Sequence, residues 1–390
     1  MFLPFELSKT GETLFEEAQQ IAAEVARPFA TEVDLDGRFP HEAIQALKDA
    51  RLLGAFVPRE HGGEGATTAD IAAIAFALGQ SCSNTAMVFA MHQIQVACLV
   101  HHGLAVESLS LYAKRVAAEQ LVLASATTEL GVGGDVRTSL CAADLTEKEF
   151  SLRKETPVIS YADHADAIMV TARRSAEAAS SDQVIIIVDR VDATLTQTLT
   201  WDTLGMRGTC SNGYLLEARG DRDRVLPEPY ADISSRTMLP VTHIWWASLW
   251  FGMATDAVNS ARQHLRTQAR KSAGDTPSSS SDVALLFADL EMVSARISSA
   301  LRLYRDAECN DAFANPGFVL RMNSLKTSVS SAVIGIITRA MNIVGIAAYR
   351  NNSDNSIARL LRDAHSTELM VHNERILQNS GRLLCVYKGQ

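Results

Sequence analysis

Two hydrophobic patterns follow one another along the chain and divide it into three parts. From residue 11 to 120, apolar side chains recur every three or four positions, which is the period of an amphipathic helix. The run that begins at Pro40 predicts a helix that Gly54 stops. Thr67 or Thr68 is the expected N-cap of the helix after it. The first part is therefore predicted to be helical.

The pattern changes near residue 121 to short runs rich in β-branched and aromatic residues, separated by glycine-containing turns. No helical period lies between these runs, which favours an antiparallel sheet or barrel over βαβ units. The predicted strands are LVLAS (121–125), PVISY (157–161), AIMVTAR (167–173), QVIIIVD (183–189) and NGYLLEA (212–218).

After residue 240 the helical period returns in two long apolar stripes. With one helix before Arg270 and one after Ile357, these stripes predict a four-helix bundle. The fold class is therefore mainly α with a small antiparallel β domain in the centre (α+β), and the predicted domains are 1–120, 121–235 and 236–390. The stripes are Leu286, Leu290, Val293, Ile297, Leu301 and Tyr304, then Met322, Leu325, Val329, Val333, Ile337, Ala340 and Val344.

Composition and charge narrow the class of protein. Of 390 residues, 47% are hydrophobic and 21% are charged, which is typical of a globular protein and not of a disordered one. A net charge of −9 argues against nucleic-acid binding, which needs a basic face. The most apolar helical run, 241–253, is too short for a membrane span, and the N-terminus lacks the order of a signal peptide. We therefore expect a cytoplasmic protein without a membrane span.

The cysteines and histidines show no metal-binding spacing. The six cysteines include no CxxC pair, so each is expected to be a buried small hydrophobic residue. The ten histidines include no HExxH motif. We predict no metal site.

Local motifs in all three parts resemble the acyl-CoA dehydrogenase superfamily, and they occur in that family's order. The resemblance covers nearly the whole chain, although each motif alone is weak. The motifs are GAFVPREHGGEG (54–65), TTELGVGGD (127–135), GMRGT (205–209), ARKSAG (269–274), MNIVGIAAY (341–349) and RLLRDA (359–364).

This resemblance implies bound FAD, with the isoalloxazine ring held by the β domain. Thr128 matches the family's threonine that bonds the pyrimidine edge, and Ser160 stands where a threonine reaches flavin N5 and O4. Gly133 and Gly134 let the backbone approach closely. Val158 replaces the aromatic residue that shields one edge of the flavin.

The same resemblance implies a homodimer or homotetramer. Arg270 matches the arginine that binds the FAD pyrophosphate of a neighbouring subunit, which a guanidinium suits. Asn342 and Gly345 match positions that line the ADP half. Thr127 and Asn373 complete the predicted cofactor-binding residues.

The sequence departs from the family at the catalytic base. The family's glutamate takes the α-proton of an acyl thioester, but the usual position holds Val371 and the alternative position holds Thr242. The serine that helps to hold the nucleotide tail is replaced by Gly134. The candidate replacement bases are Glu368, one helical turn before residue 371, and the titratable His243 and His372.

Three functions follow from these observations. The leading interpretation is α,β-oxidation of an acyl thioester, bound to coenzyme A or a carrier protein, with a separate electron acceptor or reductase. The alternative is a flavin monooxygenase of the same fold, which needs no glutamate base and which the histidine-bearing stretch 91–102 also favours. A flavin-free structural homologue is the third possibility.

Overall fold

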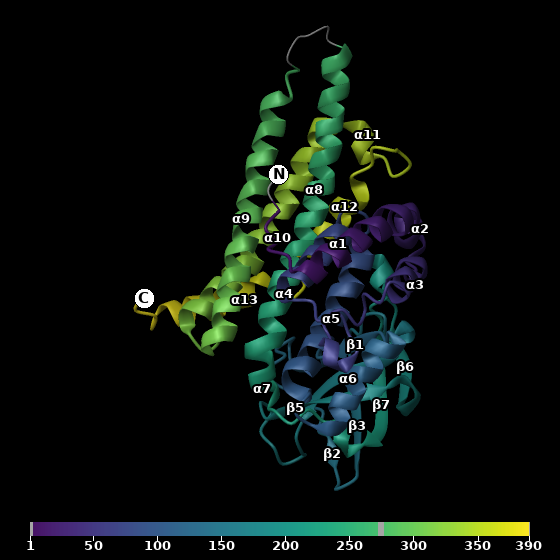
Figure 1. Ribbon diagram of the computed structural model, residues 1–390, viewed down its shortest axis with the longest axis vertical. Helices are drawn as coiled ribbons and strands as arrows, with labels where there is room; N and C mark the ends of the chain where they lie inside the picture. The colour runs from purple at the N-terminus through teal and green to yellow at the C-terminus, as the bar shows by residue number, and fades with distance from the viewer. Residues whose placement is uncertain (1–2, 272–276, 390) are drawn as a thin grey trace.

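The computed structural model describes residues 3–271 and 277–389, and its N-terminal part is helical (Figure 1). Thr67 caps α4 through a capping box with Asp70, as predicted. The helix after Pro40 ends at Asp49 rather than at Gly54, because Arg51 turns into the left-handed region with φ 59°. The helices are α1 (Lys9–Ile21), α2 (Arg27–Asp36), α3 (His41–Asp49), α4 (Thr68–Gly79), α5 (Ser83–Gly103) and α6 (Glu107–Glu119), and a π-helical turn at 22–26 joins α1 to α2.

The central part contains two small sheets. One has the order β1-β4-β5 and the other the order β2-β3-β7-β6. All strand pairs are antiparallel except β1–β4, which is parallel and departs from the purely antiparallel prediction. The run 157–161 is irregular and pairs in no ladder, since it contains a bend and a turn and Tyr161 has a φ of 44°, while β2, β3 and β6 lie where no strand was predicted. The strands are β1 (Leu123–Ala126), β2 (Asp144–Leu145), β3 (Glu149–Thr156), β4 (Ala167–Arg173), β5 (Gln183–Asp189), β6 (Ala193–Leu199) and β7 (Gly213–Asp221).

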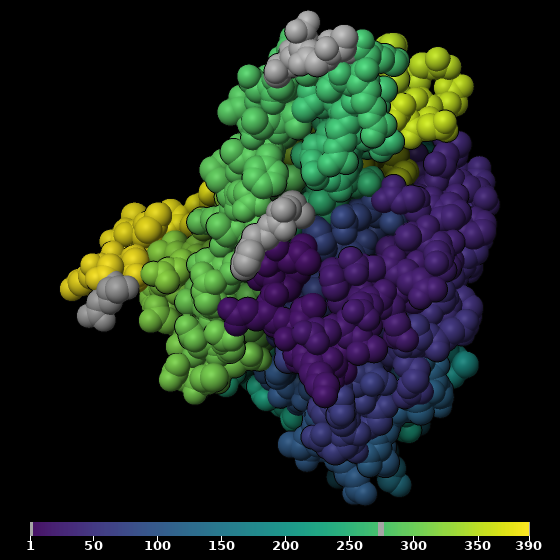
Figure 2. Space-filling view, turned by 45° about the horizontal axis from the view of Figure 1, so that its top comes forward, coloured from purple at the N-terminus to yellow at the C-terminus, as the bar shows by residue number. Residues whose placement is uncertain are grey.

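The C-terminal part is built on three long helices, α8, α9 and α10, and its fourth helix is broken. Instead of one helix after Ile357 there is a short α12, a turn at 365–372, and then α13 along the outside of the bundle (Figures 1 and 2). The bounds are α7 (Tyr230–Ile233), α8 (Leu239–Lys271), α9 (Ser280–Asn310), α10 (Pro316–Val344), α11 (Ile346–Tyr349), α12 (Ala358–Ala364) and α13 (Asn373–Leu384).

Helix α10 is the central helix of this bundle and packs along α8 and α9. Its predicted apolar stripe is buried, from Met322 to Val344. Among the described helices it alone has the length and hydropathy to cross a membrane, a composition that core helices of soluble bundles share. One buried position of this stripe is charged, namely Lys326.

A buried aspartate joins the last part of the bundle to the β domain. The Asp363 carboxylate accepts the Met206 N–H at 2.6 Å and the Ser83 hydroxyl. Burial raises the pKa of Asp363. A side chain at Gly205 would lie 2.3 Å from the Arg362 carbonyl oxygen, so only glycine permits this approach. The sequence motifs 205–209 and 359–364 therefore contact each other directly.

Candidate active site

Hydroxyl groups gather where β1, β3 and the irregular run 157–161 meet. Thr128 donates to the Val158 carbonyl at 2.9 Å and lies 3.0 Å from the Thr156 hydroxyl, which also reaches that carbonyl. These contacts fix the rotamer of Thr128, a predicted flavin ligand, and the backbone at Val158. The neighbouring Thr127 is half-buried.

Ser160 is the end of a second chain of hydroxyls. Thr209 lies 2.7 Å from Ser211, whose hydroxyl donates to Ser160 at 2.8 Å. The flanking N–H groups of Ile159 and Tyr161 bond to the segment 209–212. Among the described residues the Ser160 N–H has no acceptor, and its hydroxyl proton is free because the oxygen accepts from Ser211. This nearly buried serine can therefore offer two donors to a ligand.

The loop 127–135 supplies open backbone beside these hydroxyls. Gly133 and Gly134 have φ values of 60° and 76°, and a Cβ at Gly133 would meet nothing within 4 Å. Arg375, on the first turn of α13, donates to the Gly133 carbonyl and so brings the bundle onto the loop. Exposed glycine backbone next to a few fixed donors is the environment that an isoalloxazine ring requires.

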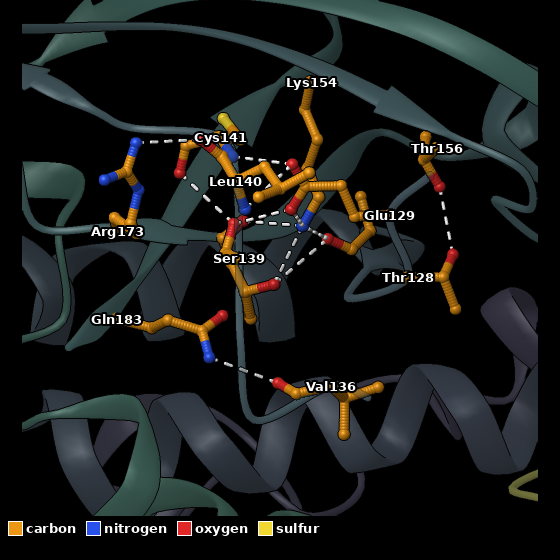
Figure 3. Close-up of polar contacts among 12 residues, drawn as sticks. Thr128, Glu129, Val136, Ser139, Leu140, Cys141, Lys154, Thr156, Arg173 and Gln183 are labelled. Carbon is orange, nitrogen blue, oxygen red and sulfur yellow. Dashed lines mark hydrogen bonds and ion pairs between the residues drawn. The ribbon is translucent and has the colours of Figure 1, made fainter. Parts of the chain in front are cut away.

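A buried pair of charged residues, Glu129 and Lys154, holds this loop against the sheets (Figure 3). The Glu129 carboxylate accepts the Ser139 hydroxyl at 2.6 Å and the Cys141 N–H at 2.6 Å. Lys154 of β3 lies 3.9 Å from this carboxylate and donates to the carbonyls of Ala126 and Thr171. The start of the loop is thereby tied to β3 and to the segment 139–141.

Lys154 is a residue that the sequence interpretation missed. Its burial lowers its pKa to about 8, and the Glu129 carboxylate opposes that shift. The inward positions of β3 are Phe150, Leu152, Lys154 and Thr156. The signal available in the sequence was therefore a lysine on the same face as two apolar core residues.

His243 lies in the core of the bundle rather than at an open site. It is 2% exposed, and its Nδ1 lies 3.1 Å from the Met322 carbonyl, to which it can donate. Burial, together with the nearby Lys326 charge, lowers the pKa of His243 to about 4. Its Nε2 has no partner among the described residues. A histidine held neutral in this way is a weak base, which argues against the predicted catalytic role.

The other two predicted bases lie in or beside the turn 365–372. The Glu368 carboxylate accepts the Ser331 hydroxyl of α10 at 2.5 Å. His372 is exposed and caps α13, with its Nδ1 accepting the Glu374 N–H. Val371 is 40% exposed, and its φ of 49° is unusual for a β-branched residue.

Lys326, which the sequence interpretation missed, lies among these candidate bases and residue 371. Lys326 donates to the Val371 carbonyl at 2.8 Å and to the Asn373 side chain at 2.7 Å. Its charge also acts on His243, and the charge of Glu368 acts on Lys326. The signal in the sequence was a lysine within the apolar stripe of α10.

The remaining predicted cofactor residues lie far from the sheets. Arg270 is near the C-terminal end of α8, and Asn342 and Gly345 are at the end of α10, both at the far end of the bundle (Figure 1). Arg270 and Asn342 are exposed, and Gly345 has a φ of 77°. The structure therefore separates these residues from Thr128 and Ser160 within one chain. Residues 272–274 of the motif 269–274 lie outside the described residues.

Two histidines of the stretch 91–102, His92 and His102, form hydrogen bonds that stabilise the fold. His92 is buried, lies 2.8 Å from the Leu53 carbonyl and accepts the Leu123 N–H. His102 contacts Glu228 and Thr237. Both ring nitrogens of His92 and His102 are therefore occupied by structural partners, whereas His101 is exposed and packs against the Phe56 ring.

Among the described residues, no three histidine, cysteine or acidic side chains lie close enough together to bind a metal ion. Three of the cysteines are buried, as predicted, but Cys309 and Cys385 are exposed, which corrects that expectation.

Comparison with known protein families matches two parts of the chain. Residues 8–106 match the acyl-CoA dehydrogenase N-terminal domain, and residues 235–371 match the acyl-CoA dehydrogenase C-terminal domain. The two matches together span more than half of the chain.

Individual relatives cover nearly the whole chain at low identity. Cyclohex-1-ene-1-carbonyl-CoA dehydrogenase of Geobacter metallireducens is 24% identical over 97% of this chain and 98% of its own length. The structure of butyryl-CoA dehydrogenase from Megasphaera elsdenii aligns with a TM-score of 0.82 and 19% identity, covering 98% of this chain and 99% of that one. Dibenzothiophene monooxygenase from Paenibacillus sp. A11-2 aligns with a TM-score of 0.80 and 18% identity, covering 96% and 97%. At these identities the structural likeness establishes the fold.

Proposed function

Because this chain belongs to the acyl-CoA dehydrogenase family and is a flavoprotein oxidoreductase of that fold, we propose that it binds FAD and works without a base at position 371. The loop 127–135, the Thr128 hydroxyl and the Ser160 donors would hold the isoalloxazine ring. We prefer FAD to FMN because Arg270, Asn342 and Gly345 match the family positions that bind the ADP half of FAD, which FMN lacks.

Flavin-dependent monooxygenation is the reaction that the site supports best. The observation that carries it is the absence of a carboxylate at 371, where the exposed side chain is valine. Of the candidate replacements, His243 is buried and neutral, and His372 caps a helix. A bound reduced flavin would supply two electrons to O₂, so that one oxygen atom goes to the substrate and the other leaves as water. The similar monooxygenase fold is consistent with this proposal, and one of its structures contains FMN.

Dehydrogenation of an acyl thioester, on coenzyme A or a carrier protein, is the second candidate. It is favoured by Glu368, a carboxylate three residues from the usual base and in the same turn. The similarity to two acyl-CoA dehydrogenases, which are named for cyclohex-1-ene-1-carbonyl-CoA and for butyryl-CoA, also favours this reaction. This reaction requires an electron acceptor, whereas the monooxygenase requires a reductase; both reactions are compatible with the proposed cytoplasmic location.

The two reactions predict different behaviour of the FAD-loaded protein. We expect that butyryl-CoA added without oxygen leaves the visible flavin absorbance unchanged. We also expect that the chemically reduced protein, mixed with O₂, reoxidises with kinetics distinct from those of free reduced FAD. Bleaching by butyryl-CoA that disappears in Glu368→Gln would establish the second candidate instead. A protein that binds no FAD at all would contradict both.

We further propose a homo-oligomer in which Arg270 reaches the FAD of a neighbouring subunit. Its separation from Thr128 within one chain supports a role across subunits. Large apolar side chains that stay exposed on two helices offer surface for self-association. They are Leu285, Phe287 and Met292 on α9, and Leu377 and Leu384 on α13.

Arg270→Ala should weaken FAD binding by about ten- to a hundred-fold, since a hydrogen bond to a charged group contributes roughly 1.5–3 kcal/mol. The measurement is the dissociation constant of FAD, with the melting temperature of the apoprotein unchanged. Lys271→Ala is the matched control, because this residue is the exposed neighbour of Arg270 on α8. Equal FAD affinity in wild type and Arg270→Ala would contradict the proposed contact.

A further inference from the structure

Lys326 is a buried cation that the proposed chemistry does not use. Its side chain is fully buried in the apolar stripe of α10. The ammonium donates to the Val371 carbonyl at 2.8 Å and to Asn373 Oδ1 at 2.7 Å, and it lies 5.9 Å from the centre of the Trp250 ring. Both hydrogen-bond acceptors belong to the turn and to the start of α13. Lys326 therefore connects the bundle core to the segment that carries residue 371.

The turn at Val371 is held in an unfavourable conformation. A β-branched residue rarely adopts a φ of 49°, and such strain persists only where surrounding contacts impose it. Besides Lys326 and the Ser331 hydroxyl that bonds to Glu368, other contacts restrain the turn, including the following two. The Asn373 N–H donates to the Glu368 carbonyl at 3.0 Å, and the Thr367 hydroxyl donates to the Ser330 carbonyl at 3.1 Å. Of these contacts, only the one from Lys326 binds residue 371 itself.

The groups around the Lys326 ammonium determine how readily it stays charged. Burial lowers its pKa to about 8, and the Glu368 carboxylate of the turn opposes that shift. From α8 it faces the neutral His243 and the ring of Trp250, and from α13 the amide of Asn373. An apolar residue of similar volume often fills such a site at no loss of stability. What the ammonium adds over such a residue is its pair of hydrogen bonds to the Val371 carbonyl and the Asn373 side chain.

We propose that Lys326 is a positioning residue of the active site, whose ammonium holds the turn 365–372 so that residue 371 faces the flavin loop. Helix α13, which follows this turn, reaches that loop through the Arg375 contact with the Gly133 carbonyl. Lys326 acts through the Val371 backbone and touches neither substrate nor cofactor. This inference rests on the proposed flavin site for its functional consequence, but not on which reaction occurs there.

The test compares Lys326→Met, which keeps the length of the side chain, with wild type and with Thr327→Val. Thr327 is the adjacent residue on α10 and bonds only within its own helix, so its replacement is a matched control. On FAD-loaded protein, we expect amide hydrogen exchange in residues 365–372 to become about ten-fold faster in Lys326→Met, since charge-assisted hydrogen bonds are lost. Lys326→Gln, a neutral donor, should recover part of the protection.

Spectroscopy distinguishes a positioning role from a purely structural one. The visible circular dichroism of bound FAD in wild type should change with pH around a midpoint of about 8, the pKa of Lys326, and this transition should be absent in Lys326→Met. Unchanged exchange in the turn would overturn the proposal. Faster exchange with an unaltered flavin signal and pH profile would overturn it as well. Failure to bind FAD in wild type would instead refute the proposed function, because the exchange measurement can still be made on the apoprotein.

Discussion

Val371→Glu should raise the rate at which butyryl-CoA reduces the bound flavin by about 10²- to 10⁴-fold. A positioned general base contributes an acceleration of that size, or roughly 3–5 kcal/mol, and valine contributes none of it. The substitution is compatible with the backbone, because glutamate is not β-branched and tolerates the φ of 49° better than valine does. The Lys326 contact is made to the carbonyl of residue 371, so it survives the change. The measurement is anaerobic loss of visible flavin absorbance.

Val371→Gln is the control, since it has the same shape without the carboxylate. If the two variants reduce the flavin equally slowly, then either residue 371 does not face the substrate or the pocket excludes thioesters. A thermal shift of the FAD-loaded protein by butyryl-CoA separates these two explanations, because only a pocket that admits the thioester is stabilised by it. If flavin reduction is faster in Val371→Glu but not in Val371→Gln, the chain has kept the family's arrangement of flavin and substrate and has lost only the catalytic base.

Glu129→Ala should lower the free energy of unfolding by about 3–5 kcal/mol, because it leaves the ammonium of Lys154 buried without a counter-charge. The substitution also removes the acceptor of the Ser139 hydroxyl and the Cys141 N–H. Since these groups hold the loop 127–135 against the sheets, FAD retention should fall as well. Urea unfolding of the apoprotein measures the first effect, and FAD titration measures the second.

The comparison for this prediction is Glu217→Ala, which breaks the exposed pair between Arg153 and Glu217 on neighbouring strands. Surface pairs contribute about 0–1 kcal/mol, so the control should remain close to wild type. Combining Glu129→Ala with Lys154→Met should recover much of the loss, because no unpaired charge then remains. A single Glu129→Ala variant as stable as the control would refute the anchoring role of the pair.

Periodicity was enough to predict the order of the three parts, because each pattern reports which face of an element is buried. The stripe from Met322 to Val344 is indeed the buried face of α10, and QVIIIVD is indeed a strand, β5. The capping box at Thr67 was also predictable, since its contacts lie within four residues. The run 157–161, which forms a bend and a turn instead of a strand, shows the limit of this reasoning. Its composition is typical of a strand, but its partner is the irregular segment 209–212.

The sequence by itself also determined the absence of the usual base, because a motif count is enough to place valine at 371. Only the tertiary structure decided what surrounds that residue. His243 and Val371 are distant in sequence, and Lys326 of α10 lies between them in space. Similarly, nothing in the sequence pairs Glu129 with Lys154, which lie on different segments and become a buried pair only when the sheets form. Charge, exposure and pKa depend on neighbours brought from other elements, so a local pattern of residues does not contain them.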